Sequence, residues 1–204
     1  MEDRIAEAEK LVRASLEKML SKAAVVRPLN LYVRAFKRER SLEVWGKKAD
    51  GTFVLIHTYP VLAASGTLGP KRKEGDRQVP EGFHHLTTMN PKSRFVLSVK
   101  VDYPNATDRK RGPEPWGTDI YIHGNQVSIG CLAMGDTVTR EFFLLVREAK
   151  LGGQNAPKID IFPCRNMEKS LDLLHTTFSP DEEVKALWKK LSVCEAKFNK
   201  TLRP

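Results

Sequence analysis

Cysteine is scarce in this chain, which has only Cys131, Cys164 and Cys194 among its 204 residues. Three cysteines cannot make a disulfide scaffold, and without any Cys-x-x-Cys pair they are badly spaced for zinc. If Cys131 is kept free for chemistry, Cys164 and Cys194 could pair in an oxidising compartment. The sequence leaves that pairing open.

Long apolar runs are also missing. No stretch approaches the eighteen or more consecutive apolar residues of a membrane-spanning helix, so we expect no transmembrane segment. The first residues, MEDRIAEAEK, are charged at once and do not have the pattern of a secretory signal. The chain is therefore expected to be either cytosolic or an exported protein whose signal has been removed.

The charge is unbalanced, with 34 Lys and Arg against 25 Asp and Glu and a net charge of +9. Such an excess favours anionic partners. Most of the basic runs also contain acids, which is typical of a solvated surface of mixed charge. No RNP-like motif, zinc-finger spacing or helix-turn-helix signature is present, so nucleic acid is not the expected partner.

The hydrophobic pattern predicts an α+β fold with a mainly antiparallel β core. Apolar residues at helical spacing predict a first helix over 2–20, and Pro28 follows it. Alternation and turn residues then predict an antiparallel meander of three strands. The expected strands are 29–36, 41–47, 52–59, 83–89, 93–101, 118–124 and 157–164, and the later helices 137–148, 166–175 and 180–200. Asp136 and Thr137 are expected to cap the first of these later helices.

Two long segments interrupt this pattern, at 65–82 and 103–118. We expect the first to be an ordered loop and the second to be a further long loop, and long loops in compact domains are usually either functional or disordered. The organisation predicted from these boundaries is an N-terminal helical segment over 1–27, a catalytic domain over 28–165 and a C-terminal helical extension over 166–204 that packs on the same domain.

The chemistry is concentrated at the end of one predicted strand, in IYIHGNQVSIGCLAM (120–134). A thiol attacks carbonyl groups as its thiolate and needs a base or a helix N-terminus nearby. His123 could supply the base, and a helix is predicted to begin shortly after Cys131. Amides around Ile129, Gly130 and Cys131 could stabilise an oxyanion, and Ser128 could hold the histidine or the loop. From spacing alone, this signal is weak, and a buried thiol in a hairpin is the favoured explanation.

The residues IHG-NQV-SIGC (122–131) resemble the signature of the L,D-transpeptidase catalytic domain family, also called YkuD: a His-Gly, then Ser or Thr, one residue, Gly and Cys. The flanks resemble one branch of that family, the YafK-like murein enzymes. These flanks are GPKRKEGDRQVPEGFHHL, VDYPNATD, PWGTDIYIHG and SIGCLAMGD.

The resemblance implies an L,D-transpeptidase-type β-sandwich and a cysteine acyltransferase that acts on peptidoglycan stem peptides. Cys131 would attack the carbonyl at the L-centre of a diaminopimelate residue and form an acyl-enzyme, with His123 as the base. Gly124, Ser128 and Gly130 are carried over as site-shaping positions. No metal or cofactor is implied, and the implied location is the periplasm.

This sequence also departs from the wider family. Ile129 stands where a second His usually precedes the Gly-Cys, the intervening loop is short, and no Arg follows the Cys. We therefore expect other residues to bind the substrate carboxylates. Candidates for substrate binding are His84, His85, Trp116 and the loop cations Lys71, Arg72, Lys73, Arg77 and Arg109.

Three other functions remain in view. The first is a hydrolase of the same family, either an L,D-carboxypeptidase or an amidase that detaches a wall-linked lipoprotein or other protein. The second is a wall-binding module without catalysis, which the intact Cys131 and His123 disfavour. The third is a nucleic-acid binder, which would require strongly salt-dependent retention of DNA.

Overall fold

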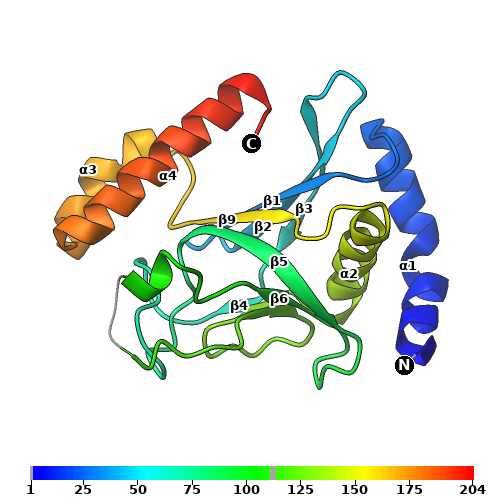
Figure 1. The fold of residues 1–204 in the computed structure, drawn as a ribbon, viewed down its shortest axis with the longest axis horizontal. Helices are drawn as coiled ribbons and strands as arrows, with labels where there is room; N and C mark the ends of the chain where they lie inside the picture. The colour runs from blue at the N-terminus through cyan, green and yellow to red at the C-terminus, as the bar shows by residue number, and fades with distance from the viewer. Residues whose placement is uncertain (1, 111–113) are drawn as a thin grey trace.

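The computed structural model of the protein describes residues 2–110 and 114–204. Within these ranges nine strands form one curled sheet, and four α-helices lie against it (Figure 1). The strand order is β3-β2-β1-β9-β5-β6-β7-β8-β4. The α+β class and the helices predicted at both ends of the chain are confirmed.

The first three strands form the predicted antiparallel meander: β1 (Leu31–Phe36), β2 (Ser41–Lys47) and β3 (Phe53–Pro60). Alternation in the sequence suggested one apolar face for β1, yet all six of its residues are buried. The reason is that the C-terminal helices cover the second face, where Tyr32 and Phe36 pack against them.

The sheet continues through β9 (Lys158–Phe162), which enters between β1 and β5 and runs parallel to β1. Strand β5 (Gly82–Asn90) bends: its first half pairs with β9 and its second half with β6 (Ser98–Val101). It therefore belongs to both halves of the sheet, which take the place of the two layers of the expected sandwich. The short strands β7 (Tyr121–His123), β8 (Leu132–Ala133) and β4 (Ala63–Ala64) complete the order.

The two edge strands of the sheet, β3 and β4, are neighbours in the chain. Only Val61 and Leu62 separate them in the sequence. The Val61 amide donates to the Arg40 carbonyl in the β1–β2 turn, and the Leu62 amide donates to the Ala133 carbonyl in β8, both at 2.8 Å. The sheet therefore curls until its edges approach, and a seam remains between the β1–β2 turn and the segment that follows β4.

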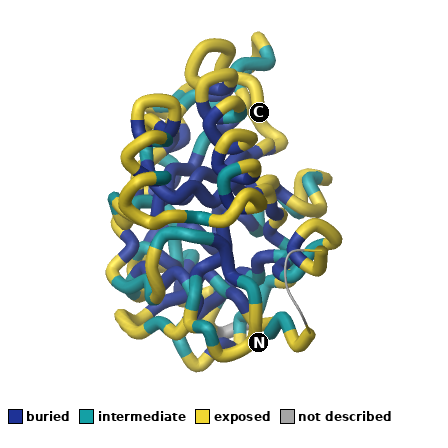
Figure 2. The backbone as a smooth tube through the Cα atoms, turned by 90° about the vertical axis from the view of Figure 1, so that its left-hand side faces the viewer, coloured by how far each residue is buried: buried dark blue, intermediate teal, exposed yellow. Residues whose placement is uncertain are grey.

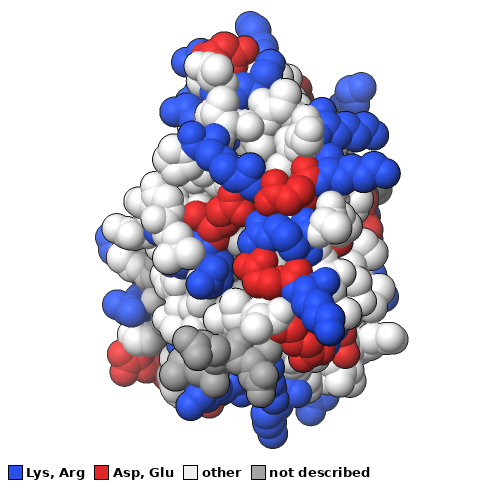
Figure 3. Space-filling model, turned by 90° about the vertical axis from the view of Figure 1, so that its right-hand side faces the viewer, with Lys and Arg blue, Asp and Glu red and all other residues white. Residues whose placement is uncertain are grey.

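One end of the sheet is covered by α1 (Glu2–Ala23) and α2 (Asp136–Leu151), which share a core with the strands. The apolar stripe of α1 enters that core through Ala8, Val12, Leu16 and Leu20. On the outer surface of this end, acidic and basic side chains interleave (Figure 3). Lys and Arg on this face therefore lie beside acids and do not form a single basic patch.

The C-terminal helices α3 (Met167–Phe178) and α4 (Glu182–Thr201) form a hairpin on the other side of the sheet. In both helices, the side that faces the sheet is buried and the opposite side is exposed (Figure 2). Asp181 caps α4 by accepting the Val184 amide at 2.9 Å. The fully buried Trp188 donates its indole N–H to Glu81 at 2.8 Å, so α4 also anchors the end of the 65–82 loop.

Three local expectations were wrong. The strand predicted over 93–101 forms only at Ser98–Val101, because residues 93–97 turn: Ser93 Oγ accepts the Phe95 amide, and Arg4 donates to the Ser93 carbonyl. Asp136 and Thr137 do not cap α2; the cap residue is Gly135. The first helix continues to Ala23, three residues beyond its predicted end.

No helix in the described ranges is both long and apolar enough to cross a bilayer. Residues 111–113 of the 103–118 loop lie outside the part of the chain that the structure describes. The proposed boundaries near residues 27 and 165 stay predictions.

Candidate active site

The strand register brings His123 and Cys131 to the same face. In the parallel pair β7–β8, His123 lies opposite Ala133 and Ile122 opposite Leu132. Extending that register by one residue places Cys131 opposite Tyr121, two residues from His123 on the same side. Tyr121, His123 and Cys131 accordingly line one cavity. The sequence motif thus corresponds to a real spatial pair.

His123 is buried and held in one tautomer. Its Nδ1 lies 2.6 Å from the Gly124 carbonyl, which can only accept, so Nδ1 carries the proton and Nε2 is left as the basic atom. Phe95 stacks on the imidazole with ring centroids 4.5 Å apart. Burial lowers the pKa of His123, which favours the neutral ring that a general base requires.

The Cys131 sulfur is partly buried between two strands. It accepts the Tyr121 amide at 3.4 Å, and its S–H donates to the Asp119 carbonyl at 3.5 Å. Burial raises the pKa of Cys131, and the nearby Asp119 carboxylate raises it further, while the Tyr121 amide and the Lys71 ammonium oppose the change. Both shifts favour the neutral thiol and the neutral imidazole at rest.

The loop before Cys131 is tied together by Ser128. Its hydroxyl donates to the Cys131 carbonyl at 2.7 Å and accepts the Gly130 amide at 3.2 Å. Gly130 has a φ of +127°, which favours glycine, and a Cβ there would lie 3.3 Å from the Gln78 carbonyl. Because its amide is occupied by Ser128, Gly130 is not a free oxyanion donor, and the amides of Ile129 and Cys131 remain as candidates.

Gly124 is required by close packing. A Cβ on it would lie 2.6 Å from the Asp136 carboxylate and 2.7 Å from the Phe95 carbonyl. Its amide donates to that same carbonyl at 3.1 Å. The residue therefore allows the 93–97 turn to approach β7, which is how Phe95 reaches the imidazole of His123.

Two cavities meet at Cys131, separated by a ridge of Asp119, Ile129 and the cysteine itself. The His-side cavity, about 430 Å³, is also lined by His123, Tyr121 and the turn at 92–95. The Lys-side cavity, about 470 Å³, is also lined by Lys71, Arg77 and residues 117–118. Ile129 is 79% exposed on the ridge. A carbonyl attacked by the sulfur can thus extend one part of its molecule into each cavity.

The two long loops build the Lys-side cavity together. Glu74 donates its amide to the Pro115 carbonyl at 2.8 Å, and Tyr103 donates its hydroxyl to the Trp116 carbonyl at 3.2 Å. Lys71 is buried, with its ammonium 2.6 Å from Asp76 and 2.8 Å from the Lys73 carbonyl. Several hydrogen bonds to the Asp76 carboxylate, from Lys71 and from backbone amides, lower its pKa.

The loop cations predicted to grip carboxylates have different surroundings. Arg77 lines the Lys-side cavity and makes no ion pair among the described residues. Arg72 instead pairs with Asp181 and Glu183 at the start of α4. Arg109 lies on the exposed η1 turn (Asp108–Lys110) and lines neither cavity, and Lys73 is exposed.

His84, His85 and Trp116 do not line either cavity. His84 is buried with Nδ1 3.2 Å from Asp102, and the half-exposed His85 lies 3.2 Å from the other oxygen of the same carboxylate. Trp116 packs against the main core. These positions favour roles in holding the 102–108 segment, and substrate binding by these residues stays a prediction.

Sequence reasoning missed the turn beside His123. Lys92, Arg94 and Phe95 line the His-side cavity, and neither cation makes an ion pair among the described residues. The stretch was interpreted as a strand because its apolar residues alternate. A turn at Asn90-Pro91 was predicted, but not its continuation into residues 93–97. The signal for that continuation is Ser93, since Ser side chains, like Asn side chains, accept amides in turns.

All three cysteines are free thiols: Cys164 is buried near Met167, and Cys194 donates to Asp160 at 3.5 Å. Across residues 2–110 and 114–204, no group of three His, Cys, Asp or Glu side chains is placed to hold a metal ion.

Comparisons with known proteins agree with this geometry. The family model of the L,D-transpeptidase catalytic domain, YkuD, matches residues 31–159. YafK of Escherichia coli K12, named as a candidate L,D-transpeptidase, is 36% identical over 143 residues, as is its O157:H7 counterpart. Each alignment covers 69% of this chain, and the chain spans 57% of the relative's length. The helical cell shape determining protein Pgp2 of Campylobacter jejuni shares the fold, with a TM-score of 0.54 at 17% identity over 91% of this chain and 77% of that one.

Proposed function

The chain belongs to the L,D-transpeptidase catalytic domain (YkuD) family, and from that premise we propose that it is a cysteine acyltransferase of peptidoglycan stem peptides. The single observation that carries the proposal is the pairing of Cys131 and His123 on one face of β7–β8, between two cavities. The proposed location is extracytoplasmic, in the periplasm.

The proposed reaction has two stages. In the first, His123 Nε2 takes the Cys131 proton, the sulfur attacks the carbonyl carbon at the L-centre of a diaminopimelate residue, and a tetrahedral oxyanion forms. The C–N bond then breaks, the imidazolium returns its proton to the leaving amine, and a thioester remains. In the second stage, an amine or water gives a proton to Nε2 and attacks the thioester carbon. The C–S bond then breaks, the acyl group leaves on the acceptor, and the imidazolium returns its proton to the sulfur.

The arrangement supports an assignment of the two cavities. The leaving amine and the attacking amine or water must both exchange a proton with Nε2, so they belong in the His-side cavity. The acyl part of the substrate then occupies the Lys-side cavity. Lys92 and Arg94 are placed to bind a carboxylate on the leaving or incoming group, and Arg77 one on the acyl group.

Mass spectrometry of products tests the proposal. The wild type and Cys131→Ala are incubated with a tetrapeptide monomer, a 3-3 cross-linked dimer and a stem peptide linked to lysine. New cross-links made only by the wild type establish transpeptidation. Loss of a terminal residue, or release of lysine with water added, establishes the hydrolase, acting as an L,D-carboxypeptidase or as an amidase that detaches a wall-linked protein. Identical products from both proteins would refute the acyl-enzyme.

A further inference from the structure

The N-terminal helix reaches the surroundings of the proposed base through one side chain. Arg4, in the first turn of α1, donates from its guanidinium to the Ser93 carbonyl at 2.6 Å and to the Val96 carbonyl at 3.2 Å. The N-terminal end of α1 accordingly lies beside the segment that joins β5 to β6 (Figure 1). The matched catalytic domain begins at residue 31, so this contact comes from outside it.

Both carbonyls belong to the 93–97 turn, whose backbone is strained. Val96 has a φ of +69°, which a β-branched residue rarely adopts. The Leu97 amide donates to the Phe95 carbonyl two residues earlier at 2.9 Å, and this bond together with the positive φ is the pattern of a rare γ-turn. Such a backbone persists only where its surroundings hold it.

Arg4 supplies part of that support. A guanidinium is always charged and only donates, so its hydrogen bonds to carbonyl oxygens are stronger than those between neutral groups. The two carbonyls that it binds, of Ser93 and Val96, stand on either side of Phe95 in the chain. Arg4 therefore fastens the turn on both sides of the residue that stacks on the imidazole.

Phe95 connects the turn to His123 in two ways. Its ring stacks on the imidazole at an interplanar angle of 25°. Its carbonyl accepts the Gly124 amide at 3.1 Å, and the carbonyl of Gly124 accepts from His123 Nδ1. A displaced turn would thus move both the ring that covers one face of the imidazole and the peptide that fixes its tautomer.

The helix that carries Arg4 is itself fixed to the domain. Ile5, the next residue, packs against the main core, as Val96 does. Glu7 joins α1 to α2 by pairing with Arg140 at 3.1 Å, and the buried apolar stripe of α1 follows. Arg4 is thus held on a rigid element, which is what the precise placement of a site requires.

We propose that Arg4 is a positioning residue for the acyl transfer. Through the 93–97 turn it keeps Phe95 stacked on His123 and so holds the imidazole in the orientation that faces Cys131. The N-terminal helix is then a working part of the site as well as a cover for the sheet. This inference rests on the proposed role of His123 as the general base.

The first test is spectroscopic and needs no activity. Nuclear magnetic resonance of the full chain follows the ring protons of His123, assigned by their loss in His123→Gln. Stacking on Phe95 shields these protons, and Phe95→Leu defines their position without the stack. Arg4→Met should move them more than halfway to that position. Arg4→Lys, which keeps a charged donor, should move them less.

The second test is a double-mutant cycle on product formation from a defined muropeptide. Arg4→Met should lower kcat/KM by about tenfold, because a misplaced catalytic group loses rate steeply. In a chain that already carries Phe95→Leu, the same change should cost less than about twofold, since the connection is already broken. Arg4→Lys should restore most of the activity, which a role in packing alone does not predict.

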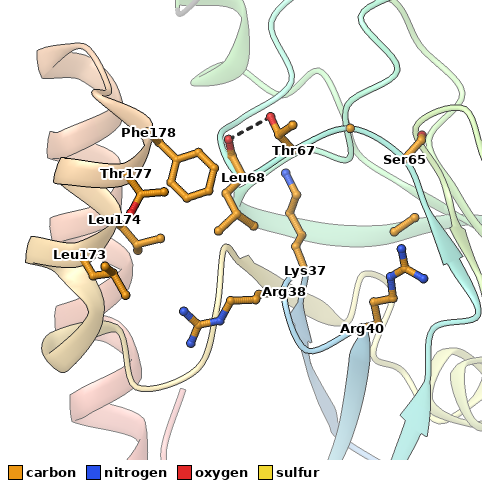
Figure 4. Close-up of a pocket in the computed structure, with 12 residues that line it drawn as sticks. Lys37, Arg38, Arg40, Ser65, Thr67, Leu68, Leu173, Leu174, Thr177 and Phe178 are labelled. Atoms are coloured by element: carbon orange, nitrogen blue, oxygen red, sulfur yellow. Dashed lines mark hydrogen bonds between the residues drawn. The ribbon is translucent and has the colours of Figure 1, made fainter.

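Two matched controls use the same substitution. Arg13→Met removes an ion pair between α1 and Glu148 of α2, at 3.0 Å, without touching the turn. Arg40→Met removes an exposed arginine that lines a cavity of about 510 Å³ at the seam of the sheet (Figure 4). That cavity shares no lining residue with the two cavities at Cys131. Both controls should leave the His123 signals and the activity unchanged.

Several outcomes would overturn the proposal. Unchanged His123 signals in Arg4→Met would mean that the turn holds Phe95 without Arg4. Additive losses from Arg4→Met and Phe95→Leu would give Arg4 another route of action, and an equal loss in Arg13→Met would assign the effect to α1 as a whole. A wild type without activity that depends on Cys131 would refute the proposed function instead, and the His123 signals would still show whether Arg4 positions the imidazole.

Discussion

The two cavities beside Cys131 hold their cations in different ways. In the Lys-side cavity, Lys71 is buried and fixed by Asp76, which itself accepts backbone amides from the same loop, while Arg77 makes no ion pair among the described residues. In the His-side cavity, Lys92 and Arg94 extend from an exposed turn and have no acidic partner among the described residues.

This difference fits the chemistry proposed for each side. A fixed charge suits the acyl group, which stays in place through both stages of the reaction. Unpaired cations on a surface turn suit a group that leaves and is replaced, because their carboxylate partner comes only with the ligand. Substitutions in the two cavities can test this difference.

The largest effect is expected from the base. His123→Gln keeps a polar side chain but removes the proton acceptor, so kcat/KM should fall by about 10² to 10⁴. Product formation from a defined muropeptide is the measurement. His57→Gln, at an exposed position on the edge strand β3, is the control. Retention of more than half the activity by His123→Gln would exclude the histidine as the base.

A smaller effect is expected from the cations that line the two cavities, and it should depend on which cavity the substituted cation lines. Arg94→Gln should raise KM by about tenfold for substrates whose leaving or incoming group carries a carboxylate. The increase in KM caused by Arg94→Gln should vanish when that carboxylate is converted to an amide. Arg77→Gln should also raise KM, and its effect should persist on the amide substrate, because Arg77 is assigned to the acyl group. The reverse pattern would exchange the roles assigned to the two cavities.

A stability effect is expected from the fixed charge. Asp76→Asn removes the partner of Lys71 and weakens the acceptor of the loop amides, so the free energy of unfolding should fall by about 1–3 kcal/mol. Denaturant unfolding measures it, with the exposed Glu182→Gln as the control. Unchanged stability would mean that the 71–78 loop does not depend on this ion pair.

The smallest effect concerns pH. The general base must be neutral, and burial lowers the pKa of His123 from its ordinary value of 6.5. Protonation therefore removes half of the activity only at a pH below that value, and kcat/KM at pH 6.5 should retain more than half of its plateau. Rates measured between about pH 4.5 and 8 test this, and a midpoint above 6.5 would contradict the buried, neutral imidazole.

Much of the fold could be predicted because its signals are local. The stripe of α1 and the meander of β1, β2 and β3 follow from apolar spacing and turn residues within a few positions. The position of β9, inserted parallel to β1, could not be predicted in this way. Its pairing joins residues more than a hundred positions apart, and alternation within the strand does not select a partner.

The sequence placed Cys131 and His123 together at the candidate site, but it predicted their surroundings only in part. The His-Gly and Ser-x-Gly-Cys residues identify the motif, and Gly124 and Gly130 stand where a side chain would collide or strain the backbone. Phe95 stacking on His123 was missed, since the alternation of residues 93–101 resembles a strand. The same local pattern is compatible with a strand and a turn, and packing decided between them.

The sequence by itself determined the thiol, the base, the glycines between them and the periodicity of the main elements, because each depends on neighbouring residues. Only the tertiary structure decided which charges are held and which are left for a ligand. Lys71 and Asp76 are fixed by the packing of two long loops, whereas Arg72 is drawn to the start of α4. Ion pairing depends on distances of a few ångströms, and these exist only once segments remote in sequence have packed together.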